Sequence, residues 1–169
     1  TPPDSLGTLT CAQLAVINLG DDGAEFQNSD LTITAARTAL GGDGRVNVGR
    51  INAETVDLGK VTVEGDLGSI FAGDANFTTG LSALTVLSMG RFGGSTQTAS
   101  PIGFTIGFSS IIGKLGALNV ASDLLTEFNM NAGFSGDAIG TVKIGGSIVG
   151  TVNFDGIIAI GNIGSIAIG

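Results

Sequence analysis

Four acidic side chains within ten residues form the first group in this sequence with the chemistry to bind an ion. They are Asp21, Asp22, Glu25 and Asp30, and no Lys or Arg lies between them. Calcium takes about six to eight oxygen ligands, several of them from carboxylates. The segment is therefore a candidate calcium site, although we expect no cofactor and keep calcium as the alternative. A solvated acidic loop is the simpler explanation of the same residues.

Catalytic chemistry has few residues to use in this chain. The sequence contains no His, which excludes Ser-His-Asp and Cys-His arrangements. General acid and base roles would fall to carboxylates or Lys. Asp21 and Asp22 are neighbours, but neighbours in a strand point to opposite faces. Three further carboxylates near glycines are interpreted as bend residues: Asp57, Asp66 and Asp74. We therefore expect a protein that is not an enzyme, with a carboxylate-dependent polysaccharide enzyme as an alternative.

A polar stretch at residues 91–101 interrupts the apolar pattern and is expected to form a protruding loop. Loops on a regular scaffold often carry function. The chain has no Trp and no Tyr to stack on a sugar ring, so Phe would have to supply that contact. The candidate binding residues for a carbohydrate or surface polymer are Arg91, Phe92, Gln97 and Phe104.

Composition and charge exclude several classes of protein. Lys and Arg number 7 against 15 Asp and Glu, and a net charge of −8 argues against binding to nucleic acid phosphates. The longest apolar stretch, residues 156–169, is too short for a membrane helix of about 20 residues. Only 13% of the residues are charged, Gly contributes 29 of 169, and there is one Cys. This composition favours a secreted or cell-surface protein.

One short phrase recurs along the chain: an aliphatic residue, Gly, any residue and a second aliphatic residue. Alternating runs such as Val142-Lys143-Ile144 follow several of its copies. Alternation with period two is typical of a strand with one buried face, and Gly allows a tight bend. The repeat therefore predicts a bend, a short strand and another bend. Strict copies begin at Leu6, Leu58, Leu67, Ile112, Leu115, Ile139, Val149 and Ile163.

The spacing of the repeat selects an architecture. Aliphatic-Gly pairs at positions 19, 40, 67, 89, 115, 139 and 163 lie 21–27 residues apart. Parallel strands normally need helical crossovers, and a coil that returns to its own start removes that need. We predict an all-β fold, a parallel β-helix (β-solenoid) of about seven coils of 21–27 residues. It would form a single domain over residues 1–169 with a less regular part at 1–40. An antiparallel β-sandwich is the alternative.

Two phrases resemble the Gly-rich repeats of large bacterial surface or secreted β-helix proteins. They are Asp66-Leu67-Gly68-Ser69-Ile70 and Gly161-Asn162-Ile163-Gly164-Ser165-Ile166, and the resemblance covers about residues 55–169. The resemblance implies an adhesin, a passenger domain or an extracellular scaffold. Some members of such families process polysaccharides, but this sequence does not match their catalytic motifs.

The end of the chain suggests how such a scaffold would be used. Residues 162–169 form a repeat phrase without a polar cap. An open solenoid end exposes apolar surface and unpaired strand edges, and covering it head to tail gives a filament. We expect a non-enzymatic structural or surface-scaffold module that self-associates or belongs to a longer extracellular solenoid or filament. A module that binds a carbohydrate or surface polymer, with a glycan as partner, is the alternative.

Overall fold

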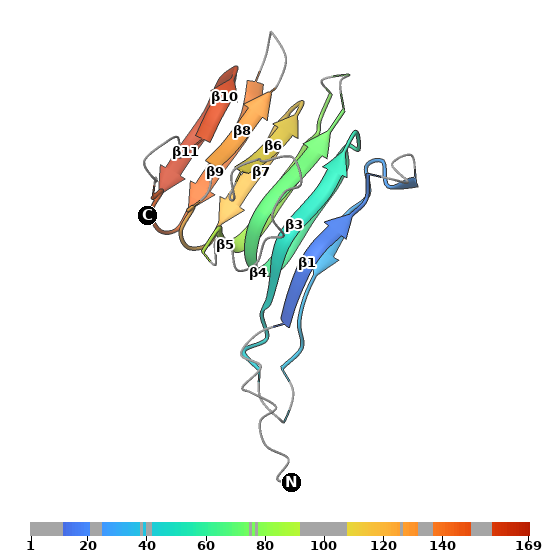
Figure 1. The fold of residues 1–169 in the computed structure, drawn as a ribbon. Helices are drawn as coiled ribbons and strands as arrows, with labels where there is room; N and C mark the ends of the chain where they lie inside the picture. Colours follow the sequence, from blue (N-terminus) through green and yellow to red (C-terminus); the bar gives the residue numbers. More distant parts are fainter. Residues whose placement is uncertain are drawn as a thin grey trace.

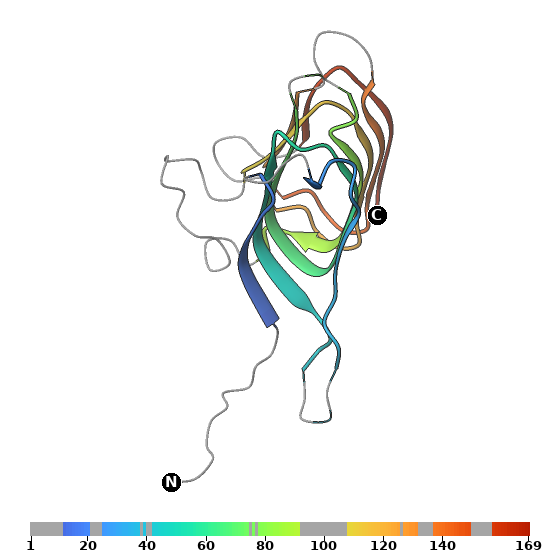
Figure 2. The ribbon, with the colours of Figure 1, turned by 90° about the vertical axis from the view of Figure 1, so that its right-hand side faces the viewer.

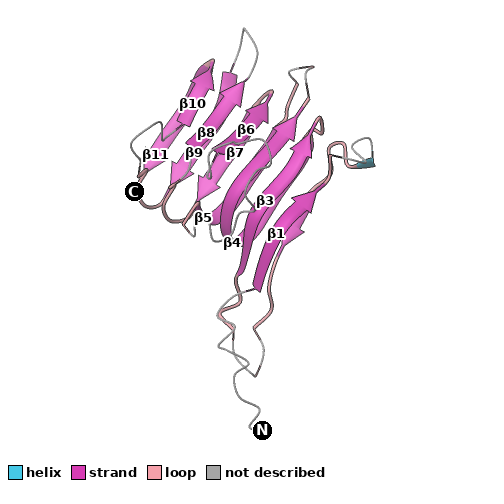
Figure 3. Cartoon of the chain, viewed as in Figure 1, coloured by secondary structure: helices cyan, strands magenta, loops and turns pink. Residues whose placement is uncertain are grey.

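The computed structural model describes residues 12–20, 25–37, 39, 42–74, 76, 78–91, 108–125, 127–131, 137–149 and 157–169. Strands joined by loops make up nearly all of this part of the chain (Figure 3), which holds a 3₁₀ turn at Glu25 and no α-helix. The strands are β1 (Ala12–Asn18), β2 (Leu31–Ile33), β3 (Val46–Glu54), β4 (Leu58–Gly73), β5 (Leu81–Met89), β6 (Phe108–Ile112), β7 (Leu115–Val120), β8 (Glu127–Asn131), β9 (Asp137–Ile144), β10 (Ile157–Ile160) and β11 (Asn162–Ile168).

All strand pairs in the described part of the chain are parallel. One sheet runs in the order β10-β8-β6-β4-β5-β7-β9-β11, while β3 pairs with both β1 and β4, and β2 pairs with β4. The predicted all-β class is confirmed. The alternative of an antiparallel β-sandwich is wrong, because no described pair runs in opposite directions. β1 and β2 belong to this same sheet, although they lie in the part at 1–40 that the composition marked as less regular.

The strands form two rows, and β4 belongs to both. Its first part pairs with β2 and β5, and its second part pairs with β3 and β6. The first row is β1, β3, the end of β4, β6, β8 and β10, and the second row is β2, the start of β4, β5, β7, β9 and β11. Strands of each row lie side by side (Figure 1), and the rows face each other across the interior (Figure 2).

The step along the chain from one strand to its partner varies. Leu115 pairs with Ile139, and Ile139 pairs with Ile163, so these two steps are equal and fall within the predicted spacing. Leu81 pairs with Leu115, and this step is longer than the predicted spacing allows. The predicted spacing is therefore wrong for this pair. The reason is the segment 92–107 between β5 and β6, which lengthens the chain without adding a described strand. The predicted spacing is also wrong for Leu31 with Val61, a longer step, and for Val48 with Leu67, a shorter one.

The interior is filled by columns of aliphatic side chains. Because the strands are parallel and in register, apolar residues of successive strands lie over one another, and burying one such side chain contributes about 1.5–3 kcal/mol. Every side chain in the three columns of the second row is at most 2% exposed. These columns are Leu58-Leu81-Leu115-Ile139, Val61-Leu84-Leu118-Val142 and Val63-Val86-Val120-Ile144.

The glycine of the repeat phrase is needed for close approach of the backbone. Gly116, Gly140 and Gly164 occupy one register position on β7, β9 and β11. A Cβ added at Gly140 would run into the carbonyl oxygen of Gly116, and one added at Gly164 would run into that of Gly140. None of the three has a positive φ. At these three positions of the repeat phrase, neighbouring strands lie too close together to leave room for a Cβ.

Candidate functional sites

The predicted calcium residues are only partly within the described chain. Asp30 is exposed, and its Oδ1 accepts a hydrogen bond of 2.6 Å from the backbone N–H of Lys60. Glu25 is also exposed, whereas Asp21 and Asp22 lie outside the described residues. Within the described ranges, no group of three or more His, Cys, Asp or Glu side chains lies close enough together to hold a metal ion. Asp30 therefore has a structural partner, and the calcium site stays a prediction.

The predicted binding loop falls mostly outside the described residues. Phe92, Gln97 and Phe104 lie there, so their placement is not described. Arg91 is exposed at the start of the loop, and its backbone N–H donates a hydrogen bond of 3.0 Å to Oδ1 of Asp66. The start of the loop is thus tied to β4 through Asp66.

Asp66 is a buried carboxylate that joins three strands. It is 1% exposed, and its Oδ1 accepts a hydrogen bond of 2.6 Å from the Ser88 hydroxyl of β5. Its own backbone N–H donates to Oδ1 of Asn47 on β3, at 3.0 Å. Hydrogen bonds to a charged acceptor are stronger than neutral ones. Asp66 therefore links β3, β4 and β5 where β4 passes from one row to the other.

Two further carboxylates link successive turns of the chain in the same way. Asp57 is 7% exposed, and its two oxygens accept hydrogen bonds from the Thr78 hydroxyl at 2.7 Å and the Asp74 backbone N–H at 3.2 Å. Asp123 accepts a hydrogen bond of 2.9 Å from the backbone N–H of Ser147. Asp57 lies between β3 and β4, which fits its interpretation as a bend residue, whereas Asp66 lies inside β4 beside a register shift with β5, so that interpretation is wrong for Asp66. Asp74 also serves a turn, because its Oδ1 accepts the N–H of Asn76 at 2.8 Å.

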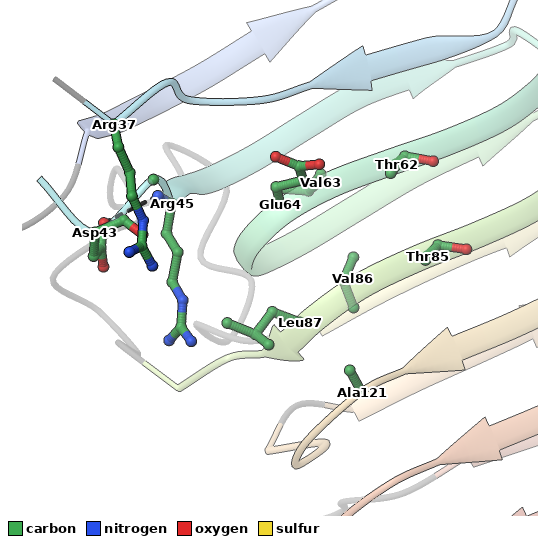
Figure 4. Close-up of a pocket in the computed structure, with 11 residues that line it drawn as sticks. Arg37, Asp43, Arg45, Thr62, Val63, Glu64, Thr85, Val86, Leu87 and Ala121 are labelled. Atoms are coloured by element: carbon green, nitrogen blue, oxygen red, sulfur yellow. Dashed lines mark hydrogen bonds between the residues drawn. The ribbon is translucent and has the colours of Figure 1, made fainter.

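A concave pocket of about 490 Å³ lies between the start of β3 and the outer part of the second row (Figure 4). Its apolar lining includes Val63, Val86 and Leu87, and two hydroxyls come from Thr62 and Thr85. The charged residues at its rim are Arg37, Asp43, Arg45 and Glu64. No sequence motif indicated this pocket, because its residues come from strands that meet only in the folded chain.

The segment that carries the two arginines is held by local hydrogen bonds. Nε of Arg37 donates to the backbone carbonyl of Asp43 at 3.1 Å. The backbone N–H of Arg45 donates to Oδ1 of Asp43 at 3.0 Å. Within the described residues, no hydrogen bond or ion pair occupies the terminal NH₂ groups of Arg37 or the guanidinium of Arg45. Two cationic groups thus face solvent beside an apolar surface, with the carboxylates of Asp43 and Glu64 in the same lining.

The sheet has edges at both ends of each row. Among the residues that the structure describes, β10 pairs only with β8, and β11 pairs only with β9. Ile160, Ile166 and Ile168 on these strands are 52%, 52% and 54% exposed. At the opposite end, Leu14 and Val16 of β1 are 42% and 45% exposed. Unpaired strand edges with apolar side chains are templates for the addition of another strand.

No protein-family model, curated protein or solved structure matches the chain. The described residues also include no helix with the length and apolar character needed to cross a membrane. Function is therefore inferred from the geometry of the chain itself.

Proposed function

We propose that this protein is a non-enzymatic structural scaffold, built as a parallel β-solenoid, that self-associates through the open edges of its sheet. The observation that carries this proposal is the state of the last strand. Ile166 and Ile168 are more than half exposed, whereas Val142 and Ile144, their partners on β9, are at most 2% exposed. On β9, which has a neighbouring strand on both sides, the side chains of the same two columns are buried.

The order of the strands supports the solenoid. From β3 onward, the chain forms a strand of the first row and a strand of the second row in turn, and all pairs within each row are parallel. Each level would be one coil, composed of one strand from each row. The described sheet then comprises six such levels, against about seven expected from the repeat, since several steps between paired strands, such as Ala12 to Val46 and Leu81 to Leu115, are longer than the repeat assumes.

The open end would gain stability from a covering strand. Full burial of one Ile side chain contributes about 1.5–3 kcal/mol, so hiding the exposed half of Ile166 or Ile168 would contribute about 1 kcal/mol each. The unpaired backbone groups of β10 and β11 would gain hydrogen bonds at the same time. These gains favour association of the edges in water.

The placement of the carboxylates supports a scaffold over an enzyme. Asp57, Asp66 and Asp123 accept hydrogen bonds from backbone N–H groups or hydroxyls that join neighbouring turns. A catalytic pair would need two carboxylates converging on one cavity. Such engaged, structural carboxylates fit a protein whose task is to hold a shape, in a secreted or cell-surface setting.

Sedimentation velocity over a range of protein concentrations tests the proposal. We expect concentration-dependent assembly of the natural chain. Ile166→Gln should abolish it, because a polar side chain would be placed in the column that a partner must bury. Ser165→Gln is the matched control, since Ser165 lies next to it on β11 and pairs with Thr141, which is exposed on β9.

Three outcomes decide the matter. Assembly that survives Ser165→Gln and is lost in Ile166→Gln supports the scaffold. A natural chain that stays monomeric at every concentration contradicts it, as does equal assembly of both variants.

Binding of an acidic glycan is a second candidate, favoured by the pocket that contains Arg37 and Arg45. A charged hydrogen bond contributes about 1.5–3 kcal/mol, so Arg45→Gln should weaken binding of a uronic acid oligosaccharide about tenfold or more in titration calorimetry. Lys143→Gln is the control, because Lys143 is an exposed cation of β9 outside the pocket. Equal affinity of both variants would contradict this candidate.

A further inference from the structure

We propose that the partner of the β10–β11 edge is the β1–β2 end of a second copy of this chain, joined head to tail in one defined register. This inference rests on the proposed scaffold function and names the partner and the contact. It is argued from the pairing of the strands, the charge of both edges and the exposure of their side chains.

The second row contains columns that begin on β2 and end on β11. Leu31 pairs with Val61, and this column continues through Leu84, Leu118 and Val142 to Ile166. Ile33 begins the neighbouring column in the same way, and that column ends at Ile168. A second copy placed with β2 on β11 would therefore set Leu31 over Ile166 and Ile33 over Ile168. The stack of aliphatic side chains would continue across the junction.

The first row gives a matching register. Asn18 of β1 begins a ladder that runs through Asn52, Phe71, Ser110 and Asn129 to Ile158 of β10. A second copy with β1 on β10 would set Asn18 over Ile158, and so Ile17 over Ile157. The same displacement of the second copy thus serves both rows, because β1 with β2 is the first level of the stack and β10 with β11 is the last.

The four edge strands lack the charged residues and prolines that often block strand addition, and the one irregularity is a register shift at the start of β11, between Asn162 and Ile163. Natural edge strands are protected by charged side chains, above all Lys, or by Pro. β1, β2, β10 and β11 contain no charged residue and no Pro. Leu14 and Val16 of β1 are exposed at one end, and Ile160 and Ile168 are exposed at the other. Two uncharged apolar edges that continue one another's columns fit a head-to-tail contact, which propagates into a filament.

A disulfide between engineered cysteines tests the register. Thr32, Thr62, Thr85, Asn119, Lys143 and Ala167 form one column on the outer side of the second row. The junction would place Thr32 of one copy beside Ala167 of the next, at the strand spacing of about 4.8 Å. That spacing lies within the Cα separation of about 4.4–6.8 Å that a disulfide needs.

Thr32→Cys and Ala167→Cys are made as separate chains, both with Cys11→Ser to remove the one natural thiol. The two are mixed and oxidised, and the products are identified by mass spectrometry. The control pairs Thr32→Cys with Ser165→Cys, which lies two residues or about 6.6 Å further along β11, so that with the spacing of about 4.8 Å between strands the two Cα atoms would be about 8 Å apart. We expect the 32–167 disulfide in about tenfold excess over the 32–165 disulfide, since the control separation exceeds the reach of the bond.

The outcomes separate this inference from the proposed function. Assembly in sedimentation without a 32–167 disulfide overturns the register and leaves the scaffold standing. A dominant 167–167 disulfide means that like ends meet, and it overturns the head-to-tail contact. The absence of any assembly, with Cys11→Ser folded by circular dichroism, overturns both, and it leaves a further coil of a longer chain as the occupant of the edge.

Discussion

Replacing Gly140 by Ala tests the physical reason for the repeated glycine. The added Cβ would run into the carbonyl oxygen of Gly116, and the carbonyl oxygen of Gly140 itself already limits the space at Gly164. These are backbone atoms of paired strands, so neither can rotate out of the way. Gly140 does not have a positive φ. Any loss of stability must therefore come from overlap between strands, not from an unfavourable backbone conformation.

The size of the effect follows from two opposing contributions. Where the native conformation accepts it, Gly→Ala stabilises by about 0.4–1 kcal/mol through the unfolded state. Overpacking costs about 1–3 kcal/mol and sometimes more. We expect overlap to win at Gly140, with a net destabilisation of about 1–2 kcal/mol. With a urea m-value of about 1–3 kcal/mol per molar, the unfolding midpoint should fall by about 1 M.

Urea unfolding followed by circular dichroism provides the assay, at concentrations where sedimentation shows a monomer. Gly164→Ala is the first control, and it should cost less because β11 has a partner strand on one side only and can shift. Gly42→Ala is the second, because nothing lies within 4 Å of its added Cβ but its φ is +102°. It should cost about 1 kcal/mol through the backbone alone. A urea midpoint that rises in Gly140→Ala would refute the close-approach explanation.

Two further predictions concern the interior. Leu118→Ala should destabilise the monomer by about 2–5 kcal/mol, because Leu118 is fully buried in the middle of its column. Asn119→Ala on the outer side should cost less than about 1 kcal/mol. Similar urea midpoints for the two variants would count against the buried columns. Asp66→Asn should lower the free energy of unfolding by about 1–3 kcal/mol, because it weakens the hydrogen bonds from Ser88 and Arg91. Asp43→Asn at the exposed turn should lower it much less. Equal losses of stability in the two variants would show that Asp66 does not link the strands as described.

The pairing within the two rows continues across a long segment between β5 and β6. The segment 92–107 lies between β5 and β6, yet the register resumes on both sides of it, with Leu81 on Leu115 and Phe71 on Ser110. Each level is held by its neighbours above and below, so a long connection does not disturb the stacking.

The candidate sites were only partly within reach of sequence reasoning. The uncapped phrase at 162–169 pointed to the edge formed by β11, because a repeat without polar residues is visible in the sequence itself. The pocket at Arg37 and Arg45 gave no such signal. Thr62 and Thr85 lie far apart in the sequence and become neighbours only through the pairing of β4 with β5.

The amino-acid sequence by itself determined the strand character, the outward and inward faces and the parallel stacking of like on like. Alternation and the aliphatic-Gly phrase act over a few neighbouring residues, so they can be read without knowing the partner strand. Only the tertiary structure decided which strands pair, how long each circuit is and why glycine recurs. Those properties depend on backbone contact between residues that are distant in the sequence, such as Val48 with Leu67 and Phe71 with Ser110, and no local pattern records that distance.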